Sequence, residues 1–401
     1  MNSFIYNAPT KVYFGTDSDD KLTEIISEYG CRRVLLHYGS GSAVKSGLIK
    51  RVKWALERAD VKIVELGGVK PNPRLSLVYE GIELCRAEKV DFILAVGGGS
   101  VIDSAKAIGM GVAGGGDVWD YYENKRTPES TLPVGVILTV AASGSEMSKS
   151  SVITNDKTHV KRGRNVEISR PVFAILNPEL TVSVPPYPTA CGCADIFMHT
   201  LERYLNGGKN MSITDSMAEA LMTTVIAASK KVIKNPADLN ARADLMWAGS
   251  LSHNGLFSCG TDGGDWCTHS LGHELSAKYD TAHGASLTAV WGSWARYVYK
   301  NCLNRFHRFA VQVMGVRPNG TREELALKGI EYCEEWFASM GLPTSIKGLG
   351  VNPTDEELKL MAENWAENWA ENNGGEKGSC KKLRKEDALA IYTAAAACSR
   401  S

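Results

Sequence analysis

Three histidines lie close together in the C-terminal half, in the stretch THSLGHELSAKYDTAHG (268–284). The chain has only eight histidines in all, so this density is unusual. His269 and His273 are four residues apart, a spacing that puts both imidazoles on one face of a helix. His283 follows ten residues later, directly before a glycine, as if a turn brings it back toward the other two.

A carboxylate and another imidazole recur at the same spacing upstream, at Asp195 and His199. One carboxylate with three or four imidazoles is a donor set that suits Zn²⁺ or Fe²⁺. Either pair alone is explained more simply by an amphipathic helix with incidental histidines. The two pairs together with His283 favour a divalent-metal site, because clustered imidazoles and carboxylates need a reason to be desolvated together.

The N-terminal half contains residues suited to binding phosphate. A continuous apolar run at 92–96 leads into GGGS (97–100) and then into a helical stretch. Glycines let a phosphate approach the backbone, and the helix N-terminus offers unpaired amides and the positive end of the helix dipole. Ser100 with Asp103 also fits a capping box, a structural role that is compatible with phosphate binding.

Small residues follow two other apolar runs in the same way. The run 33–37 is followed by YGSGS (38–42), and the run 132–140 by AASGS (141–145). Because helical stretches alternate with these runs, we expect a parallel sheet covered on both faces. The three junctions then line one edge of the sheet, where nucleotides bind in open α/β folds. The usual GxGxxG signature is absent, so this site is a variant.

The character of the chain changes at PPYP (185–188). Strand-like runs give way there to long helical patterns, and we expect an α/β domain at 1–186 and an all-helical domain at 187–401. At the amino terminus, the alternating segment 4–15, broken by Pro9, predicts an edge hairpin. Phosphate-binding loops in one domain and histidines in the other suggest hydride transfer in a cleft between them, from a dinucleotide to a metal-activated oxygen.

Composition argues against several classes of function. The 401 residues include 45 Lys and Arg and 45 Asp and Glu, so no net basic field attracts nucleic acid or an anionic membrane. The first residues lack the charged and apolar regions of a signal peptide, and no run of about twenty apolar residues predicts a membrane span. The ten cysteines are scattered without a CxxC pair, which is typical of free thiols in a cytoplasmic protein.

Together these motifs resemble the iron-containing (group III) alcohol dehydrogenases, and within them the NADP(H)-linked butanol dehydrogenase and broad aldehyde reductase branch. The resemblance covers essentially the whole chain. It depends on PTKVYFG (9–15), KPNP (70–73), GGGSVIDSAK (97–106), SGSEM (143–147), ADIFMHTLE (194–202), DWCTHSLGHELSA (265–277) and DTAHG (280–284). It implies a dinucleotide-binding α/β domain followed by an all-α metal-binding domain, as in dehydroquinate synthase-like folds.

The resemblance also implies roles for individual residues. The implied metal ligands are Asp195, His199, His269 and His283. His273 is then either a proton-relay group near the substrate or a hydrogen-bonding neighbour of the ligands. The implied cofactor contacts are Gly39, Ser40, Ser42, Asn72, Gly97, Gly98, Gly99, Ser100, Asp103, Thr139, Ser143 and Lys161.

The cofactor is expected to be NADP(H) in preference to NAD(H). Strictly NAD-dependent relatives have an Asp just after the second strand, where it binds the ribose hydroxyls and repels a 2′-phosphate. This chain has Gly39 and Ser40 there, with Lys45 nearby. With one divalent metal, Fe²⁺ or Zn²⁺, these features predict a cytoplasmic enzyme that interconverts a primary alcohol such as butanol and its aldehyde. The resemblance implies a homodimer, and no nucleic-acid or membrane partner is expected.

Three alternatives stay open at this level. A polyol dehydrogenase of the glycerol type and a dehydroquinate-synthase-like lyase use the same scaffold, but the lyase needs a basic pocket, and the C-terminal half shows no obvious cluster of Arg and Lys. The third alternative is a non-catalytic nucleotide-binding or structural-metal module. Structural metal sites are closed and usually richer in thiolates, whereas an Asp-plus-His set leaves room for a substrate oxygen.

Overall fold

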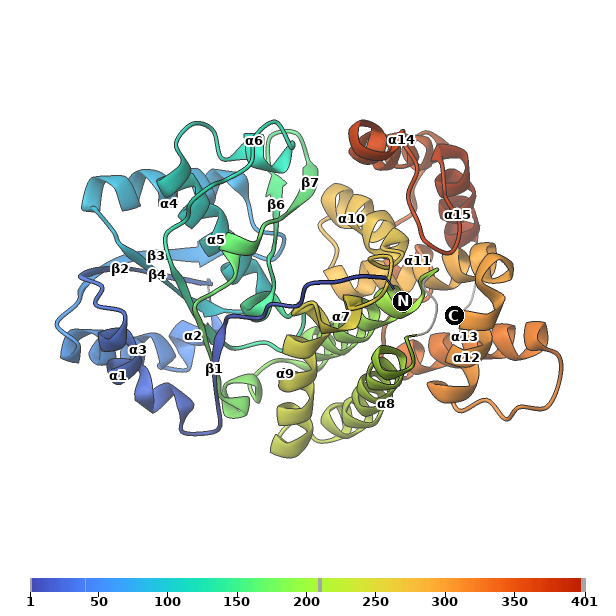
Figure 1. Cartoon of the computed structure of the whole chain (residues 1–401), viewed down its shortest axis with the longest axis horizontal. Helices are drawn as coiled ribbons and strands as arrows, with labels where there is room; N and C mark the ends of the chain where they lie inside the picture. Colours follow the sequence, from blue (N-terminus) through green and yellow to red (C-terminus); the bar gives the residue numbers. More distant parts are fainter. Residues whose placement is uncertain (1, 40, 208–210, 398–401) are drawn as a thin grey trace. The chain divides into compact units, whose positions relative to one another are not determined.

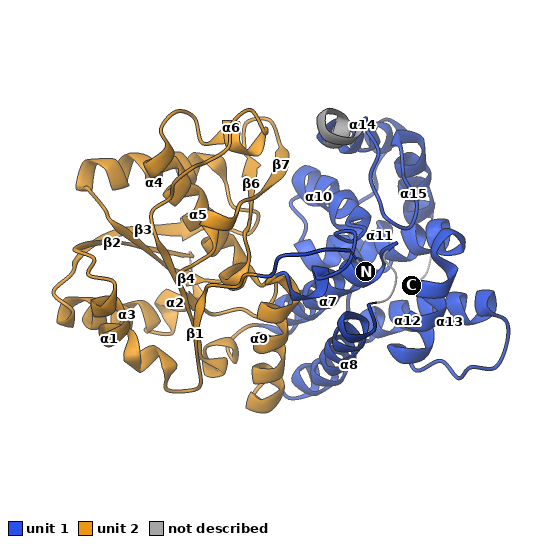
Figure 2. Cartoon of the chain, viewed as in Figure 1, with its two compact units in different colours: residues 1–6, 185–235, 255–401 blue, residues 7–184, 236–254 orange. Residues whose placement is uncertain are grey.

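The computed structural model describes residues 2–39, 41–207 and 211–397. Two compact units make up the chain (Figure 2). Unit 2 comprises Asn7–Val184 and Pro236–Asn254, and unit 1 comprises Met1–Tyr6, Pro185–Asn235 and Gly255–Ser401.

Unit 2 is built on a six-stranded sheet in which every neighbouring pair of strands is parallel. In spatial order the strands are β1 (Lys11–Phe14), β8 (Phe173–Leu176), β5 (Val134–Leu138), β4 (Phe92–Gly97), β2 (Arg33–Gly39) and β3 (Lys62–Val69). The connecting helices are α1 (Leu22–Glu28), α2 (Ser42–Lys45), α3 (Leu48–Arg58), α4 (Leu75–Glu88), α5 (Gly99–Gly114) and α6 (Trp119–Tyr122). Because the strands are parallel, their carboxyl ends lie at one edge of the sheet.

Both faces of this sheet are buried, and the alternation of side chains along β4 shows it. Ile93 and Ala95 belong to the core cluster that includes residues of α4 and α5. Phe92, Leu94 and Val96 belong to the opposite cluster, with residues of α1 and α3. Figure 1 shows these helix pairs on the two sides of the sheet. The predicted parallel sheet with two covered faces is confirmed.

A separate antiparallel hairpin, β6 (Ser150–Asn155) and β7 (Val160–Asn165), completes unit 2. The backbone N–H of Thr154 donates to the carbonyl oxygen of Pro73 at 2.9 Å, which attaches the hairpin to the turn after β3. The hairpin therefore brings β7 close to the KPNP segment, from which it is separated by about 90 residues of sequence.

The amino-terminal segment differs from the predicted edge hairpin at 4–15, and that prediction is wrong. Only Lys11–Phe14 forms a strand, β1, and it pairs in parallel with β8 at the edge of the sheet. Residues 2–10 form no helix or strand. Pro9 cannot donate a ladder hydrogen bond, so the first arm of a hairpin is weakened, while β8 offers β1 a full set of partners.

Helix α9 (Leu239–His253) belongs to unit 2, although the sequence places it in the helical domain. The hydroxyl of Ser250 donates to the Glu146 carboxylate at 2.6 Å, and Nδ1 of His253 lies 2.8 Å from the carbonyl oxygen of Ser143. These long-range contacts place 236–254 in unit 2. The main boundary at Pro185 lies beside the expected division at residue 186.

Unit 1 consists of helices, as its sequence pattern predicts. They are α7 (Pro186–Tyr204), α8 (Ser212–Lys234), α10 (Cys267–Tyr279), α11 (His283–Val298), α12 (Leu303–Gln312), α13 (Arg322–Ser339), α14 (Asp355–Asn373) and α15 (Lys385–Ala397). An aromatic core links α7 to α11, α12 and α13. The ring centroid of Phe197 lies 4.6 Å from that of Trp336 and 6.3 Å from that of Phe309. The ring centroids of Trp291 and Phe337 are 5.9 Å apart. This core fixes α7, which carries two of the predicted metal ligands.

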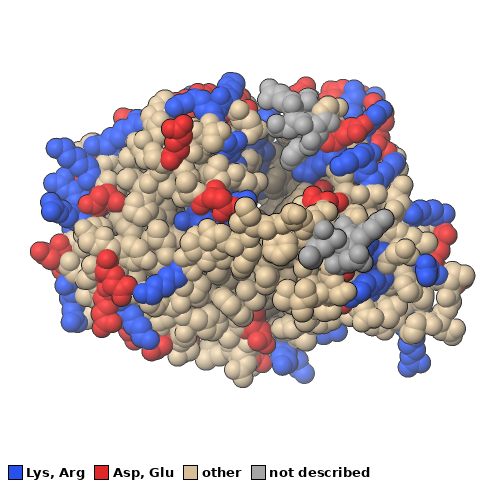
Figure 3. Space-filling view, in the orientation of Figure 1, with Lys and Arg blue, Asp and Glu red and all other residues tan. Residues whose placement is uncertain are grey.

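Among the described residues, no helix is both long and apolar enough to cross a membrane. On the face shown in Figure 3, Lys and Arg are interspersed with Asp and Glu, and no continuous field of one sign is visible. That face therefore offers no extended basic surface of the kind that binds nucleic-acid phosphates.

Candidate metal centre

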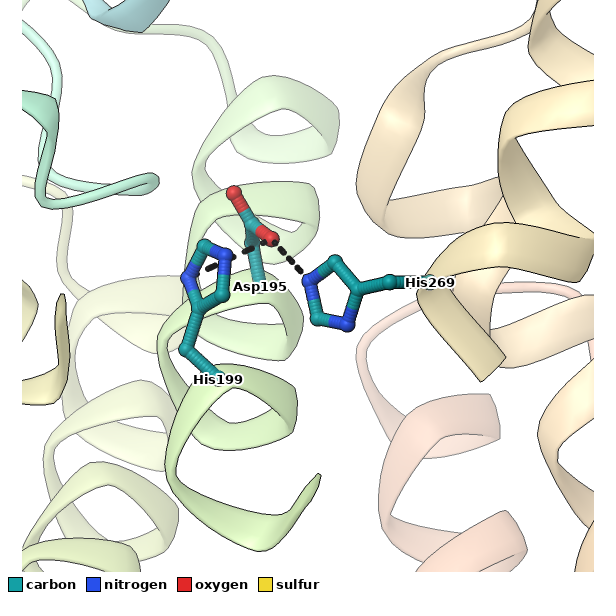
Figure 4. A group of neighbouring side chains, drawn as sticks. All are labelled: Asp195, His199 and His269. Atoms are coloured by element: carbon teal, nitrogen blue, oxygen red, sulfur yellow. Dashed lines mark ion pairs between the residues drawn. The ribbon is translucent and has the colours of Figure 1, made fainter. Parts of the chain in front are cut away.

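The predicted metal ligands come from three helices of unit 1. Asp195 and His199 lie one turn apart on α7, His269 lies in the first turn of α10, and His283 is the first residue of α11. Figure 4 shows Asp195, His199 and His269 pointing toward one another from α7 and α10. The packing of α11 against both α7 and α10 brings together side chains that the sequence separates by up to 88 residues.

The carboxylate of Asp195 is the centre of this group. Its Oδ1 lies 3.7 Å from Nδ1 of His199, 3.6 Å from Nε2 of His269 and 3.5 Å from Nε2 of His283. Asp195, His199 and His269 are buried and each offers a ligand atom within 4.8 Å of the others. The side chain of His283 is 26% exposed, and it contacts this group at Asp195. Three of the four predicted ligands therefore form one buried group, and His283 contacts that group at Asp195.

The donors fit a divalent cation. Ligand atoms bound to one metal at about 2.0–2.1 Å in a tetrahedral arrangement lie roughly 3.4 Å apart, close to the separations around Asp195. Asp195 Oδ1 and His269 Nε2 are buried and form no hydrogen bond with any described residue. Buried polar atoms without partners are costly, and a bound cation would satisfy both.

Glu202 contacts one of the predicted ligands, and the sequence analysis did not single it out. It is fully buried on α7, and its carboxylate accepts a hydrogen bond from Nδ1 of His269. Burial by itself lowers the pKa of His269, but interactions with Glu202 and Asp195 outweigh it and raise the pKa to about 9. The negative charge that attracts a proton to this imidazole also attracts a cation, and the two compete. Glu202 lies seven residues after Asp195, two helical turns away, so its spacing places it on the Asp195 face of α7, but its contact with His269 is visible only in the structure.

His273 lies beside the ligands without being among them. It is half-buried on α10, and its ring centroid lies 5.2 Å from that of His283 and 6.4 Å from that of His269. Its place one turn after His269 follows directly from the helical spacing. The position is compatible with either role predicted for it.

The predicted cofactor residues lie at the carboxyl edge of the sheet in unit 2. Gly39 ends β2, Gly97 ends β4, and the N–H of Thr139, just after β5, donates to the carbonyl oxygen of Gly97 at 3.0 Å. A Cβ atom at Gly99 would lie 2.2 Å from Oγ and 3.0 Å from Cβ of Ser143, so a larger residue where α5 begins would displace the Ser143 side chain. The structure thus brings these four segments together. Gly98, Ser100 and Ser42 lie at the starts of α5 and α2, and Ser40 lies outside the described residues.

Asn72 and Lys161 form a second part of this predicted site. Nζ of Lys161, on β7, donates to Oδ1 of Asn72 at 2.9 Å, and both side chains are buried. Asn72 has a left-handed backbone conformation, with φ of 54°, in the turn after β3. The contact depends on the hairpin, which carries Lys161 across to a turn 89 residues earlier.

Asp103 has a structural role that the predicted capping box does not describe. Helix α5 begins at Gly99 without a side-chain cap, so the expected pairing of Ser100 with Asp103 is wrong. Asp103 Oδ1 accepts from the hydroxyl of Ser145 at 2.6 Å, and Oδ2 accepts from the N–H of Val152 at 2.9 Å. Burial raises the pKa of Asp103, and the charge of Lys106 opposes that shift. Its carboxylate therefore ties β6 and the 143–147 loop to α5.

Models of known protein families match most of the chain, in two separate segments. The model of the iron-containing alcohol dehydrogenases matches residues 9–178, and the model of the C-terminal domain of the Fe-containing alcohol dehydrogenase family matches residues 189–396. These two matches cover most of the chain. They decide against the lyase and against a non-catalytic module, which the sequence had left open.

Full-length relatives agree with the family models. NADH-dependent butanol dehydrogenase A of Clostridium acetobutylicum is 40% identical over 393 residues, covering 98% of this chain and 99% of its own. The NADPH-dependent aldehyde reductase YqhD of Escherichia coli is 34% identical over 355 residues, covering 88% and 90%. The crystal structure of NADH-dependent butanol dehydrogenase A from Thermotoga maritima superposes with a TM-score of 0.94 at 38% identity, covering 99% of both chains. The chain belongs to the iron-containing alcohol dehydrogenase family and is an oxidoreductase that acts on the CH–OH group of alcohols.

Proposed function

We propose that the protein is a metal-dependent aldehyde reductase and alcohol dehydrogenase that interconverts short aliphatic aldehydes, such as butyraldehyde, with their primary alcohols, using NADP(H). The observation that carries the proposal is the set of three imidazoles around one oxygen of Asp195. The names of the relatives, which include butanol dehydrogenases and an aldehyde reductase, support the substrate class.

Residues of unit 1 have separate roles in holding and positioning the metal. Asp195, His199, His269 and His283 would hold Fe²⁺ or Zn²⁺, and Glu202 orients His269. When bound, the cation supplies a Lewis acid and the nicotinamide supplies or accepts the hydride. Burial of Asp195, His199 and His269 limits the access of water, which strengthens electrostatic interactions at the reacting oxygen.

We assign proton transfer to a ring nitrogen of His273, which is half-buried beside His283. An imidazole can both accept and donate a proton, which is what a proton-transfer group must do. Replacing His273 with Asn should lower turnover while the metal content stays normal. Replacing His269 with Ala should remove both metal and activity. An active, metal-free His269→Ala protein would refute the proposed function.

The residues at the end of β2 support a preference for NADP(H). Gly39 leaves no carboxylate there to repel a 2′-phosphate. Glu65, on the neighbouring strand β3, is already engaged by Lys53 at 2.6 Å and by the hydroxyl of Tyr38 at 3.2 Å. Relatives with NADH and with NADPH in their names are both found, so this local chemistry is the basis of the proposal.

A single substitution tests the cofactor proposal. A Cβ atom at Gly39 would meet Val69 O at 3.6 Å and Val101 Cγ2 at 3.9 Å, which are ordinary contacts, so a side chain fits. Gly39→Asp should lower the ratio of kcat/KM with NADPH to kcat/KM with NADH by about 10-fold or more, since like charges in contact cost ~1.4 kcal/mol or more. Gly39→Asn has the same shape without the charge and should leave the ratio nearly unchanged. A wild-type enzyme that prefers NADH would refute this part of the proposal.

The identity of the metal and the oligomeric state complete the proposal. The donor set accepts iron or zinc, and elemental analysis of the purified protein decides between them. A cytoplasmic homodimer is proposed from the resemblance to the family. Phe4 and Ile5, which are 52% and 97% exposed, are apolar side chains that a second subunit could cover. Light scattering after size-exclusion chromatography tests the dimer.

A polyol substrate is the second candidate. It is favoured by a 28% identical relative named 1,3-propanediol dehydrogenase, and activity with diols tests it.

A further inference from the structure

Glu202 lies beside the predicted metal ligands and contacts one of them. It is fully buried in the last turn of α7, three residues after His199. Oε1 accepts hydrogen bonds from the backbone N–H groups of Thr268, at 2.7 Å, and His269, at 3.3 Å. Oε2 accepts from the ring nitrogen Nδ1 of His269. Three donors from the first turn of α10 therefore converge on one carboxylate.

The two backbone contacts alone describe a helix cap. Helix α10 begins at Cys267, so the N–H groups of Thr268 and His269 have no acceptor within the helix. A carboxylate at that place also meets the positive end of the helix dipole. Capping does not explain the contact with the His269 ring, and this third bond connects Glu202 to the metal site.

The third bond selects one tautomer of His269. A neutral imidazole has one N–H donor and one acceptor nitrogen. The Glu202 carboxylate already accepts from two backbone N–H groups of the same turn, and it is the acceptor for the ring as well, so Nδ1 is the donor. In the neutral ring that binds a cation, the lone pair is then on Nε2. Nε2 is the atom that lies 3.6 Å from Asp195 Oδ1 and has no hydrogen bond with any described residue. The ring therefore presents its acceptor nitrogen to the other ligands.

We propose that Glu202 is a positioning residue of the metal centre, which keeps His269 in the tautomer and orientation that bind the cation and makes its imidazole a stronger donor. This inference depends on the proposed metal-binding function. A carboxylate behind a ligating histidine raises the basicity of the ligand, and its loss typically weakens metal binding by about 10–100-fold.

The variant Glu202→Gln separates positioning from capping. Glutamine keeps one carbonyl oxygen, which can still cap Thr268 and His269. Its amide then faces Nδ1 as a donor and favours the tautomer that protonates Nε2, the wrong one for metal binding. Glu334→Gln is the matched control, because Glu334 is a buried carboxylate of the same unit that accepts from Arg296 at 2.7 and 2.5 Å.

The experiment titrates Co²⁺ into the full-length proteins after removal of metal by a chelator, and measures the dissociation constant from the visible absorption of the bound ion. We expect Glu202→Gln to bind about 10–100-fold more weakly than wild type, and Glu334→Gln to bind as wild type does. Equal affinity in wild type and Glu202→Gln overturns the inference, as does equal weakening in both variants. A wild-type protein that binds no Co²⁺ overturns the proposed function instead.

A second measurement needs no variant and so does not depend on the variant folding. With eight histidines in the chain, ¹⁵N-histidine labelling of the Zn²⁺-loaded wild type gives few ring signals. The signal assigned to His269 should show a proton on Nδ1 that exchanges slowly with water, because the site is buried. A proton on Nε2 at neutral pH overturns the inference.

Discussion

Gly284 controls the position of a metal ligand through its lack of a side chain. It follows His283 in the first turn of α11. A Cβ atom there would lie 2.2 Å from the carbonyl oxygen of Cys191 and 2.8 Å from its C and Cα atoms. These are backbone atoms of α7 and cannot rotate away. Gly284→Ala must therefore move α11 away from α7, which carries Asp195.

The size of the displacement follows from the overlap. Ordinary contact begins at 3.4 Å, so the alanine methyl group needs about 1.2 Å of additional room. Moved by that amount, Nε2 of His283 lies up to about 4.7 Å from Oδ1 of Asp195, instead of 3.5 Å. Two ligands of one cation with bonds of about 2.0–2.2 Å cannot be more than ~4.4 Å apart. We expect His283 to leave the site, metal affinity to fall on the order of 100-fold, and the free energy of unfolding to fall by about 1–3 kcal/mol.

The assay is competition for Zn²⁺ against a chromophoric chelator, combined with urea unfolding of the metal-free protein. Gly329→Ala is the control, because its Cβ would lie 2.5 Å from Cβ and 2.8 Å from Cα of Ala310, at the α12–α13 contact. It should destabilise the protein to a similar degree and leave metal affinity unchanged. Wild-type affinity in Gly284→Ala refutes the reasoning, because α7 and α11 would then accommodate the methyl group without moving the ligands.

Two further predictions concern buried groups of unit 2. His37 is fully buried between the Leu66 carbonyl and the Ser104 hydroxyl, and burial lowers its pKa to about 4. Below pH 6.5 the unfolded chain therefore binds a proton that the folded protein does not, so stability falls between pH 6.5 and 4. The loss of stability between pH 7 and pH 5, from urea unfolding, should be about 2 kcal/mol larger in wild type than in His37→Gln, and equal losses would show that His37 does not contribute. Nζ of Lys106 donates to the carbonyl oxygens of Ser145, Ser148 and Ser150 at 2.7, 2.9 and 2.8 Å. Lys106→Met leaves these acceptors buried without a donor and should cost about 3–5 kcal/mol in the same measurement, whereas a cost below ~1 kcal/mol would mean that water replaces the ammonium.

Features that depend on local periodicity could be predicted from the sequence. The strand β4 is recognisable because its continuous apolar run supplies both cores, and the helices of unit 1 because their apolar spacing repeats along the chain. The hairpin strand β7, VKRGRN, shows no such pattern, since it pairs with β6 and leaves polar side chains outside the core. The amino-terminal hairpin was predicted wrongly because alternation does not reveal the partner of a strand, and β8 is about 160 residues away.

Some features of the candidate site could likewise be predicted from the sequence, and others could not. The spacing of Asp195 with His199, and of His269 with His273, is sufficient to place each pair on one helical face, and the motifs around them are sufficient to indicate the family. Neither spacing nor motif shows that Glu202 accepts from His269, or that Gly284 lets α11 approach α7. Hydrogen bonds and close contacts between helices depend on distances across the fold, which the sequence does not contain in any local pattern. The sequence by itself therefore determined which side chains could bind a metal, and only the tertiary structure decided which carboxylate positions them and which glycine lets them meet.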